Sequence, residues 1–223
     1  MKNIAIILAG GSGSRFNQST PKQFLYLDDR RIIDYSISTF INHKDIDDII
    51  IVCHNKWKKI MESEYPDYKV VIGGSTRQKS VLKGLESCSL STLNVFIHDA
   101  ARPFISKKNI SQSIKLLKTY KAVNISVPAI DTTIIVQDNI ISSTLNRNNI
   151  YLSQTPQSFR YKTILNAHQS SNEINLTDDI QMINNLGIDC YNLEGDANNI
   201  KITYSKDLDV AMLILKNKMK EMI

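Results

Sequence analysis

Short apolar runs alternate with longer amphipathic segments along about two thirds of this chain. Residues 4–8, 48–53 and 94–98 are short, apolar and bounded by polar or small residues, which is typical of strands buried on both faces. The segment 32–40 carries apolar residues at helical spacing. Strands that alternate with helices form mostly parallel sheets with helices on both faces. The sequence therefore predicts an α/β, Rossmann-like fold.

The same patterns predict the remaining elements. Further strands are expected at residues 68–72, 122–128, 151–159 and 189–193. Further helices are expected at residues 57–65, 80–88, 108–120, 161–168, 178–186 and 205–222. No repeat, low-complexity tract or linker divides the chain, so we expect a single domain over residues 1–223.

Composition and charge narrow the class of protein. Of the 223 residues, 42% are hydrophobic and 22% charged, which is ordinary for a soluble globular protein with a substantial core. The net charge of +5 favours anionic ligands. The basic residues are scattered and do not interleave with aromatic ones, so we expect no nucleic-acid partner.

Cysteine usage and hydropathy bear on the compartment. The three cysteines are far apart and show neither metal-ligand spacing nor a disulfide framework, so we expect reduced thiols in a cytoplasmic protein. We find no signal-peptide pattern and no apolar run of membrane-spanning length, and therefore expect no membrane partner.

A glycine-rich segment follows the first predicted strand. It reads Leu-Ala-Gly-Gly-Ser-Gly-Ser-Arg over residues 8–15 and precedes a Thr-Pro-Lys-Gln-Phe stretch at 20–24. Small residues let backbone N–H groups approach a phosphate chain, and Arg15 and Lys22 can neutralise a triphosphate. The spacing fits neither the Walker A pattern nor the dinucleotide fingerprint. The residues alone therefore leave a nucleotide phosphate loop and a structural turn both open.

A second polar cluster, His-Asp-Ala-Ala-Arg-Pro, follows the predicted strand at 94–98. Asp99 then emerges at a strand's carboxyl end, at the same sheet edge as the glycine-rich segment. A carboxylate there is costly unless it binds a cation or forms an ion pair, and Mg²⁺ is commonly held by carboxylates together with substrate phosphates. We favour metal or substrate contact for Asp99, with an Asp99–Arg102 ion pair as the alternative. His98 is interpreted as structural.

Three further segments carry candidate residues. Gly73-Gly74 ends a predicted strand, and Ser80 is expected at the start of the next helix, where its hydroxyl caps the helix or contacts a base. Thr177 is expected to cap the helix that follows, with two acids in its first turn. Lys201 lies between two β-branched residues in a strand-like stretch and, facing inward, requires an anionic partner such as a phosphate.

A hairpin is predicted in the second half of the chain. Residues 133–137 and 140–144 are β-rich and flank the two-residue turn Asp138-Asn139. A hairpin inserted into an α/β domain has little core of its own, so we expect this arm, about residues 132–150, to pack against the same arm of a second subunit. Arg147 follows the hairpin; it either reaches a neighbouring subunit's site or is an exposed arginine.

Taken in order, these segments resemble the 2-C-methyl-D-erythritol 4-phosphate cytidylyltransferase family over nearly the entire chain. They are similar also to the ribitol-5-phosphate cytidylyltransferases. The motifs that carry the resemblance are Ala-Gly-Gly-x-Gly-x-Arg, Pro-Lys-Gln, Gly-Gly-x-x-Arg-x-x-Ser-Val, His-Asp-Ala-Ala-Arg-Pro, Asp-Thr, Gln-Thr-Pro-Gln, Thr-Asp-Asp and Asn-Ile-Lys-Ile-Thr.

The resemblance implies an enzyme that transfers CMP from CTP to 2-C-methyl-D-erythritol 4-phosphate and releases pyrophosphate, in non-mevalonate isoprenoid biosynthesis. It also implies a homodimer and Mg²⁺, or another divalent cation, as cofactor. The implied catalytic residues are Arg15, Lys22, Arg147 and Lys201. The implied CTP-binding residues are Leu8, Ala9, Gly10, Gly11, Gly13, Arg15, Lys22, Gly74, Ser80, Asp99 and Ala100. The implied polyol-phosphate residues are Asp99, Arg102, Thr132, Arg147, Thr177 and Lys201, with Arg147 supplied by the partner subunit. Asp99 is the implied metal ligand.

Three alternatives remain open at this point. The stretch Thr133-Ile134-Ile135 stands where the methylerythritol family usually has a basic residue, which favours D-ribitol 5-phosphate as the acceptor and CDP-ribitol as the product. A catalytically silent nucleotide-binding module would bind CTP without turnover. A sugar-1-phosphate nucleotidyltransferase would use UTP or ATP.

Overall fold

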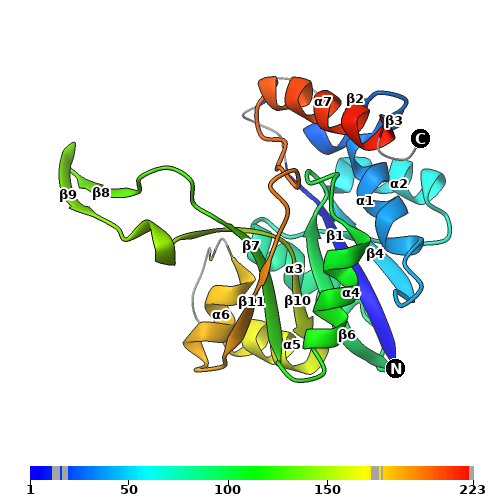
Figure 1. The fold of residues 1–223 in the computed structure, drawn as a ribbon. Helices are drawn as coiled ribbons and strands as arrows, with labels where there is room; N and C mark the ends of the chain where they lie inside the picture. Colours follow the sequence, from blue (N-terminus) through cyan, green and yellow to red (C-terminus); the bar gives the residue numbers. More distant parts are fainter. Residues whose placement is uncertain (12–15, 17–19, 172–175, 177, 221–223) are drawn as a thin grey trace.

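A computed structural model describes residues 1–11, 16, 20–171, 176 and 178–220 of the chain (Figure 1). Its centre is a seven-stranded sheet in the order β11-β7-β10-β6-β1-β4-β5. β10 runs antiparallel to both of its neighbours, and the other paired strands run parallel. The predicted mostly parallel sheet is therefore confirmed. The strands are β1 (Lys2–Ala9), β4 (Asp48–Cys53), β5 (Lys69–Ile72), β6 (Thr92–Asp99), β7 (Ala122–Pro128), β10 (Tyr151–Arg160) and β11 (Cys190–Glu194).

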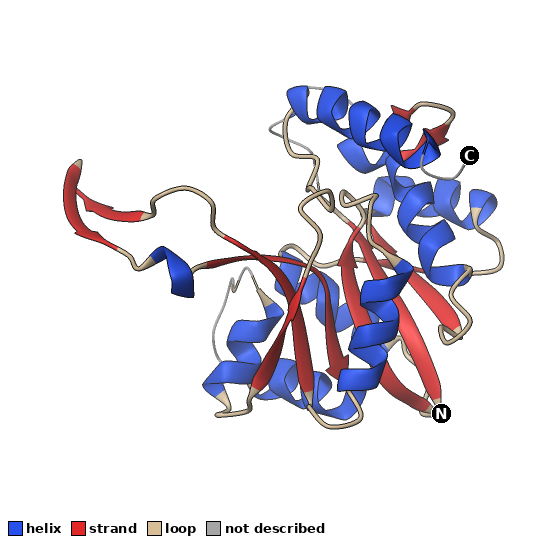
Figure 2. Ribbon diagram, viewed as in Figure 1, coloured by secondary structure: helices blue, strands red, loops and turns tan. Residues whose placement is uncertain are grey.

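Helices cover both faces of this sheet, as predicted (Figure 2). On one face lie α1 (Ile32–Ile41), α2 (Lys58–Glu64) and α4 (Lys107–Leu116). On the other lie α3 (Arg77–Glu86), α5 (Tyr161–Ser170) and α6 (Asp179–Asn185). The last helix, α7 (Lys206–Lys220), packs on a smaller apolar cluster beside the short β2 (Tyr26–Leu27) and β3 (Arg30–Arg31) ribbon.

The alternation of side chains along β1 explains why both faces are covered. Ala5 and Ile7 belong to the apolar cluster under α1, whereas Ile4 and Ile6 belong to the cluster under α3 and α5. All four side chains are almost completely buried. Because successive residues of a strand point to opposite faces, a strand that is apolar throughout requires cover on both sides.

The start of α3 differs from the prediction. The helix begins at Arg77, three residues before Ser80, and Thr76 is its N-cap, with Oγ1 accepting from the Lys79 N–H at 3.1 Å. The β-region backbone of Thr76 lets its hydroxyl reach back into the first turn. Ser80 therefore lies inside the helix, and the expectation that it caps the helix is wrong.

The cap of α6 also differs. The Asp178 carboxylate accepts from the Ile180 N–H at 2.7 Å, so Asp178 is the N-cap that Thr177 was expected to be. Thr177 itself lies outside the described residues. Asp179 is the first residue of the helix and is buried, so one of the two predicted acids is the cap and only the other lies in the first turn.

The predicted hairpin is confirmed. β8 (Ile134–Gln137) and β9 (Ile140–Thr144) pair antiparallel, and all nine residues are exposed. Asp138 and Asn139 have φ angles of 49° and 65°, the left-handed conformation of a two-residue type I′ turn. The arm extends away from the sheet and its helices (Figure 1). Its position leaves its apolar side chains without cover from their own chain.

Two further expectations concern cysteines and membrane spans. All three cysteines are free, as predicted. No helix in the described part of the chain is long and apolar enough to cross a bilayer.

Candidate functional site

A cavity of about 750 Å³ opens where β1, β4, β5 and β6 end. These four strands are parallel, so their carboxyl ends meet at one edge of the sheet, the usual ligand position in open α/β folds. The predicted meeting of the glycine-rich segment and Asp99 at this edge is confirmed. The walls are formed by Leu8, Gly10, Gly11, Lys22, Gln23, Cys53, His54, Asn55, Ile72, Gly73, Gly74, Ser75, Thr76, Arg77, Ser80, Asp99, Ala101, Lys201 and Thr203.

The turn between β5 and α3 requires glycine. A Cβ atom on Gly74 would lie 2.3 Å from Cβ of Lys79 and 3.0 Å from its backbone carbon. A Cβ atom on Gly73 would lie 2.8 Å from Oγ of Ser80. Ser80 fixes the same turn, since its Oγ accepts from the Gly74 N–H at 3.1 Å and donates to the Thr76 carbonyl at 2.8 Å. The backbone of Gly74 is thereby held at the cavity wall.

Gln23 anchors the start of the glycine-rich segment. Its Nε2 donates to the carbonyl oxygens of Ala9 at 2.6 Å and Gly11 at 3.0 Å, and the side chain is buried. Gln23 belongs to the short 3₁₀ helix η2 (Lys22–Phe24), whose Phe24 stacks on Trp57 with ring centroids 4.5 Å apart. The amide therefore fixes two carbonyl groups and places Lys22 beside the cavity.

Asp99 carries the negative charge of the site. Its Oδ2 is 2.6 Å from Nζ of Lys201, and its Oδ1 is 3.6 Å from Nε of Arg77. Burial raises the pKa of the Asp99 carboxyl, but Lys201 and then Arg77 outweigh burial and hold this pKa well below its ordinary value. Asp99 is thus a carboxylate that is balanced by two cations at neutral pH.

The alternative ion pair between Asp99 and Arg102 is wrong. The guanidinium of Arg102 donates instead to the carbonyls of Asn199 at 2.8 Å and Ser153 at 3.3 Å. Arg102 does not line the cavity. It joins the loop after β6 to β10 and to the loop before Lys201, because its planar fork spans two separate carbonyl groups.

Lys201 has the anionic partner that its sequence context required, but that partner is the Asp99 carboxylate. The residue lies in a loop rather than in the strand-like stretch that was expected. The neighbouring Ile202 holds this loop in place: its side chain is fully buried, and its N–H donates to the Ala101 carbonyl at 2.9 Å. The Lys201 side chain remains 40% exposed, so its ammonium is accessible from the cavity.

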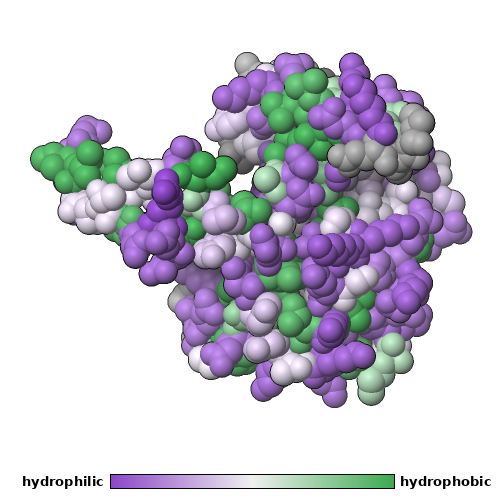
Figure 3. All heavy atoms as spheres, viewed as in Figure 1, coloured by the Kyte–Doolittle hydropathy of each residue, from purple (hydrophilic) through white to green (hydrophobic). Residues whose placement is uncertain are grey.

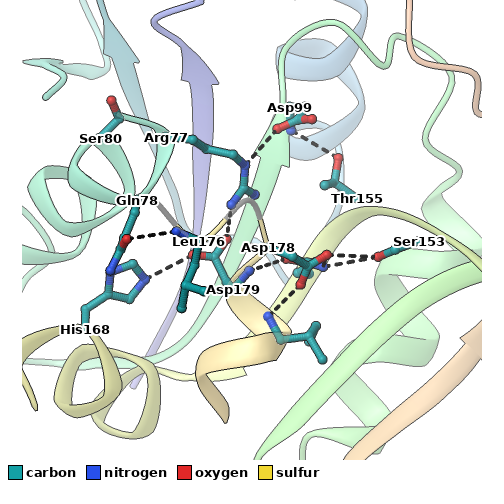
Figure 4. A network of polar contacts seen from close by, with 12 residues as sticks. Arg77, Gln78, Ser80, Asp99, Ser153, Thr155, His168, Leu176, Asp178 and Asp179 are labelled. Atoms are coloured by element: carbon teal, nitrogen blue, oxygen red, sulfur yellow. Dashed lines mark hydrogen bonds and ion pairs between the residues drawn. The ribbon is translucent and has the colours of Figure 1, made fainter. Parts of the chain in front are cut away.

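A buried polar network continues from Arg77 away from the cavity (Figure 4). Nη1 of Arg77 lies 2.6 Å from Oδ2 of Asp179, and Oδ1 of Asp179 lies 3.0 Å from Nε2 of His168. Burial raises the pKa of the Asp179 carboxyl, but Arg77 and the His168 hydrogen bond hold this pKa below its ordinary value. Asp179 is therefore a buried charge with partners on two sides, where the sequence predicted an acid in the first turn of a helix.

His98 is structural, in agreement with its interpretation from sequence. It is completely buried and lies 3.0 Å from the Arg102 carbonyl through Nε2 and 3.1 Å from Thr155 Oγ1 through Nδ1. Thr155 Oγ1 in turn accepts from the Asp99 N–H at 3.1 Å. Burial lowers the pKa of His98 to about 4, so the ring is neutral and supports the backbone of Asp99.

The family model described as IspD, 2-C-methyl-D-erythritol 4-phosphate cytidylyltransferase, matches residues 3–217. The chain belongs to this family. A relative of that name from Caldicellulosiruptor saccharolyticus is 38% identical over 99% of this chain and 100% of its own length. Another from Clostridium tetani is 40% identical over 96% of this chain and 91% of its own length.

Solved structures give the same result. The 4-diphosphocytidyl-2C-methyl-D-erythritol synthase from Anaerococcus prevotii matches with a TM-score of 0.86 at 30% identity, over 96% of each chain. The Francisella tularensis 2-C-methyl-D-erythritol 4-phosphate cytidylyltransferase matches with a TM-score of 0.83 at 30% identity, over 96% of this chain and all of that one. The chain is therefore an enzyme of the cytidylyltransferase class, as the motifs implied. The comparisons do not favour the ribitol alternative.

The structure brings many of the residues implied by the family resemblance together. The cavity walls include Leu8, Gly10, Gly11, Lys22, Gly74, Ser80, Asp99 and Lys201. Ala9 and Ala100 are buried beside these walls. Gly13, Arg15 and Thr177 lie outside the described residues.

The two candidates on the arm lie apart from the others. Thr132 and Arg147 are exposed and do not line the cavity of their own chain. Nη1 of Arg147 donates to the Ile130 carbonyl at 2.9 Å, and Arg147 begins the short helix η4 (Arg147–Asn149). Both residues are thus separate from the cavity of their own chain, and the two interpretations of Arg147, a neighbouring subunit's site or an exposed arginine, stay open.

Asp99 is the residue that suits a divalent cation. Within the described ranges, no three carboxylate, imidazole or thiolate side chains converge. The Asp99 Oδ1 atom has its ion-pair partner at 3.6 Å, beyond direct hydrogen-bond distance, and is a hard oxygen donor beside the cavity. A single carboxylate of this kind fits a Mg²⁺ ion whose other ligands are phosphate oxygens and water.

Proposed function

We propose that this chain transfers CMP from CTP to 2-C-methyl-D-erythritol 4-phosphate and releases pyrophosphate. The observation that carries the proposal is the contact between Lys201 and Asp99 at a cavity that also includes Lys22 and the glycine-rich segment, in a chain of this family. The cavity volume of about 750 Å³ lies in the range of small-molecule sites. Two lysines beside one carboxylate leave a positive excess suited to two phosphorylated reactants.

The proposed reaction is an in-line displacement. A phosphate oxygen of the acceptor attacks the α-phosphorus of CTP, a new P–O bond forms, and the bond to the bridging oxygen breaks as pyrophosphate leaves with its electron pair. The protein contributes position and charge rather than covalent chemistry. We assign Lys22 to the triphosphate and the developing charge on the leaving group, and Lys201 to the attacking phosphate. The family resemblance adds Arg15 to the first of these tasks.

We place the nucleotide half of the site between the carboxyl ends of β1 and β5. We assign the backbone of Ala9, Gly10 and Gly11 to the cytosine and ribose, as the family resemblance implies; Gln23 supports this assignment, because it holds the carbonyls of Ala9 and Gly11 in place at the cavity. Gly74 and Ser80 are assigned to the cytosine and ribose. The glycine turn supports this assignment, since it brings backbone rather than a side chain to the wall.

The acceptor half is assigned to Asp99, Lys201 and, through the family resemblance, Arg102, Thr132, Arg147 and Thr177. The ammonium of Lys201 contacts Asp99 in the structure. An incoming phosphate offers a second anion to this 40% exposed group, so Lys201 can contact both. The position of Arg102 behind the wall makes it a support for this half rather than a direct contact.

Mg²⁺ is proposed as the cofactor, with Asp99 as its protein ligand. Asp99 would hold the cation, and the chemistry supplied by the cation would be neutralisation of phosphate charge. The residues around it have separate tasks: Lys201 balances the carboxylate, and Thr155 fixes the backbone of Asp99.

A homodimer through the arm is proposed as the functional form. The arm exposes Ile140 by 71% and Ile141 by 61%, and Ile130 at its base by 80%. Figure 3 shows apolar side chains gathered on the arm. Apolar side chains gathered on a two-stranded projection are typical of an interaction surface rather than of a solvated one. A partner arm would cover them and would bring Arg147 and Thr132 toward the other subunit's cavity.

The test is pyrophosphate release with defined substrates. The chain is assayed with CTP and Mg²⁺ and with either 2-C-methyl-D-erythritol 4-phosphate or D-ribitol 5-phosphate as acceptor. We expect release with the methylerythritol acceptor, loss of release on chelation of Mg²⁺, and at least a tenfold preference for CTP over UTP and ATP. Faster release with ribitol 5-phosphate would reverse the assignment of the acceptor, and no release with either would refute the function. The cytoplasmic location stays a prediction.

A further inference from the structure

Arg77 lies between a carboxylate of the cavity and a carboxylate of the interior (Figure 4). Its Nε faces Oδ1 of Asp99 at 3.6 Å, and its Nη1 contacts Oδ2 of Asp179 at 2.6 Å. The Asp179 side chain is only 2% exposed and does not line the cavity. One guanidinium therefore connects the charged wall of the site to a group that no substrate can reach.

Asp179 is itself fixed from the far side. His168 contacts its Oδ1 at 3.0 Å, and its backbone N–H donates to Oε1 of Gln157 at 3.2 Å. A guanidinium is planar and its N–H directions are rigid, so fixing Nη1 also fixes the direction of Nε. The contact with Asp179 thereby sets how Arg77 faces Asp99.

The same turn of α3 also contacts the start of α6. Oε1 of Gln78 accepts from the Leu176 N–H at 3.2 Å. Gln157, from β10, holds the same segment by donating to the Asp178 carboxylate at 2.8 Å. The glycine turn that forms part of the cavity wall directly precedes Arg77. The first turn of α3 thus connects the wall assigned to the nucleotide with the segment assigned to the acceptor.

We propose that Arg77 is a positioning residue, which orients the Asp99 carboxylate beside Lys201 from its anchor on Asp179 and His168 without binding the nucleotide. The inference rests on the proposed cytidylyl transfer. Asp99 has two cationic partners, and Arg77 is the one that is itself held by a buried group. A shift of a reacting group by about 1 Å can lower a rate by about a hundredfold, so loss of the anchor should affect turnover even though the anchor is remote from substrate.

A double-mutant cycle tests this proposal. The variants are Arg77→Met, Asp179→Asn and the two together, with kcat and both KM values measured for each. We expect each single substitution to lower kcat by about 10- to 100-fold and to change the KM for CTP by less than about threefold. The double variant should be no slower than the slower single variant, because both substitutions break the same contact.

Two further variants serve as controls. Lys79→Met removes an exposed cation from the same helical turn and should leave kcat within about twofold. Arg77→Lys keeps the positive charge, but a single ammonium cannot replace a planar guanidinium that faces two carboxylates, so its kcat should be as low as that of Arg77→Met. The Arg77→Met variant leaves the buried Asp179 carboxylate with His168 as its remaining partner and can therefore unfold. The double variant removes both the guanidinium and the carboxylate, so no unpaired buried charge remains, and its kcat can still be measured if a single variant unfolds.

Several results would overturn the proposal. An Asp179→Asn variant with unchanged kcat, alongside an Arg77→Met variant with a raised KM for CTP, would make Arg77 a direct nucleotide contact. If the fold-loss of kcat in the double variant equals the product of the two single losses, Arg77 and Asp179 act independently and the proposal is wrong. The carboxyl ¹³C resonance of Asp99 gives a readout without activity, because Arg77 faces the Asp99 carboxylate itself. This resonance should shift in both single variants and stay unchanged in Lys79→Met. If the unmodified chain releases no pyrophosphate, the proposed function fails, and the Asp99 carboxyl resonance still decides whether Arg77 orients Asp99.

Discussion

Replacement of Gln23 by methionine should weaken both the fold and the nucleotide site. The side chain is buried, and both of its partners are carbonyl oxygens, so its amide nitrogen has to face them. Methionine has a similar length but no donor. The Ala9 carbonyl belongs to a residue that is 1% exposed, and leaving such an acceptor unpaired costs about 1–3 kcal/mol. Gly11 is exposed, so water can replace its lost bond at little cost.

The expected loss in the free energy of unfolding is therefore about 2 kcal/mol. In a chain of 223 residues this corresponds to a fall in Tm of roughly 4–8 °C. Because the freed carbonyls can turn toward the triphosphate, the KM for CTP should rise by about tenfold. The assays are thermal unfolding, followed by circular dichroism, and pyrophosphate release as CTP is varied.

Matched variants separate the hydrogen bonds from the exchange of side chains. Gln169→Met makes the same substitution at an exposed position of α5 and should change stability by less than about 0.5 kcal/mol. Gln23→Glu keeps the shape but offers no donor to the carbonyls, so it should be at least as damaging as Gln23→Met. The reasoning is refuted if Gln23→Met matches the unmodified chain in both Tm and the KM for CTP.

Three other outcomes are expected. Lys22→Met and Lys201→Met should each lower kcat by about a hundredfold, roughly 3 kcal/mol of transition-state stabilisation; unaltered turnover in both would remove these lysines from the mechanism. The pKa of His98 is lowered from 6.5 to about 4, so between these pH values the unfolded chain binds a proton that the folded chain does not. The free energy of unfolding should therefore fall by up to about 3 kcal/mol as the pH drops from 6.5 to 4. A His98→Gln variant should show a shallower dependence of unfolding on pH. Ile141→Lys on the arm should shift the protein from dimer to monomer in analytical ultracentrifugation and lower kcat, whereas an unchanged sedimentation coefficient would count against the arm as the interface.

Local patterns were sufficient for most of the fold. The apolar run at residues 4–8 predicted a strand buried on both faces, and β1 is covered on both. Asp138 and Asn139 predicted a tight hairpin because few other residue types adopt positive φ at low cost. The carboxyl end of a strand placed Asp99 at the edge where the cavity opens.

The direction of β10 was not contained in these patterns. Its sequence predicts a strand, but a parallel and an antiparallel neighbour have the same local signature. The arm leaves the sheet where β7 ends and returns the chain at that same edge, so β10 runs back beside β7 and separates it from β6. The tertiary path of the arm, rather than strand propensity, decides this direction.

The sequence by itself determined the strands and helices of the main sheet and its covering layers, the hairpin, and the arrival of the glycine-rich segment and Asp99 at the carboxyl edge of the sheet. All of these follow from the spacing of neighbouring residues. Only the tertiary structure decided which charges meet. Lys201 with Asp99, and Arg77 with Asp179, are each 102 positions apart in the chain. Such a contact depends on which strands become neighbours and on the desolvation that burial imposes on both charges, and no periodicity along the chain carries that information.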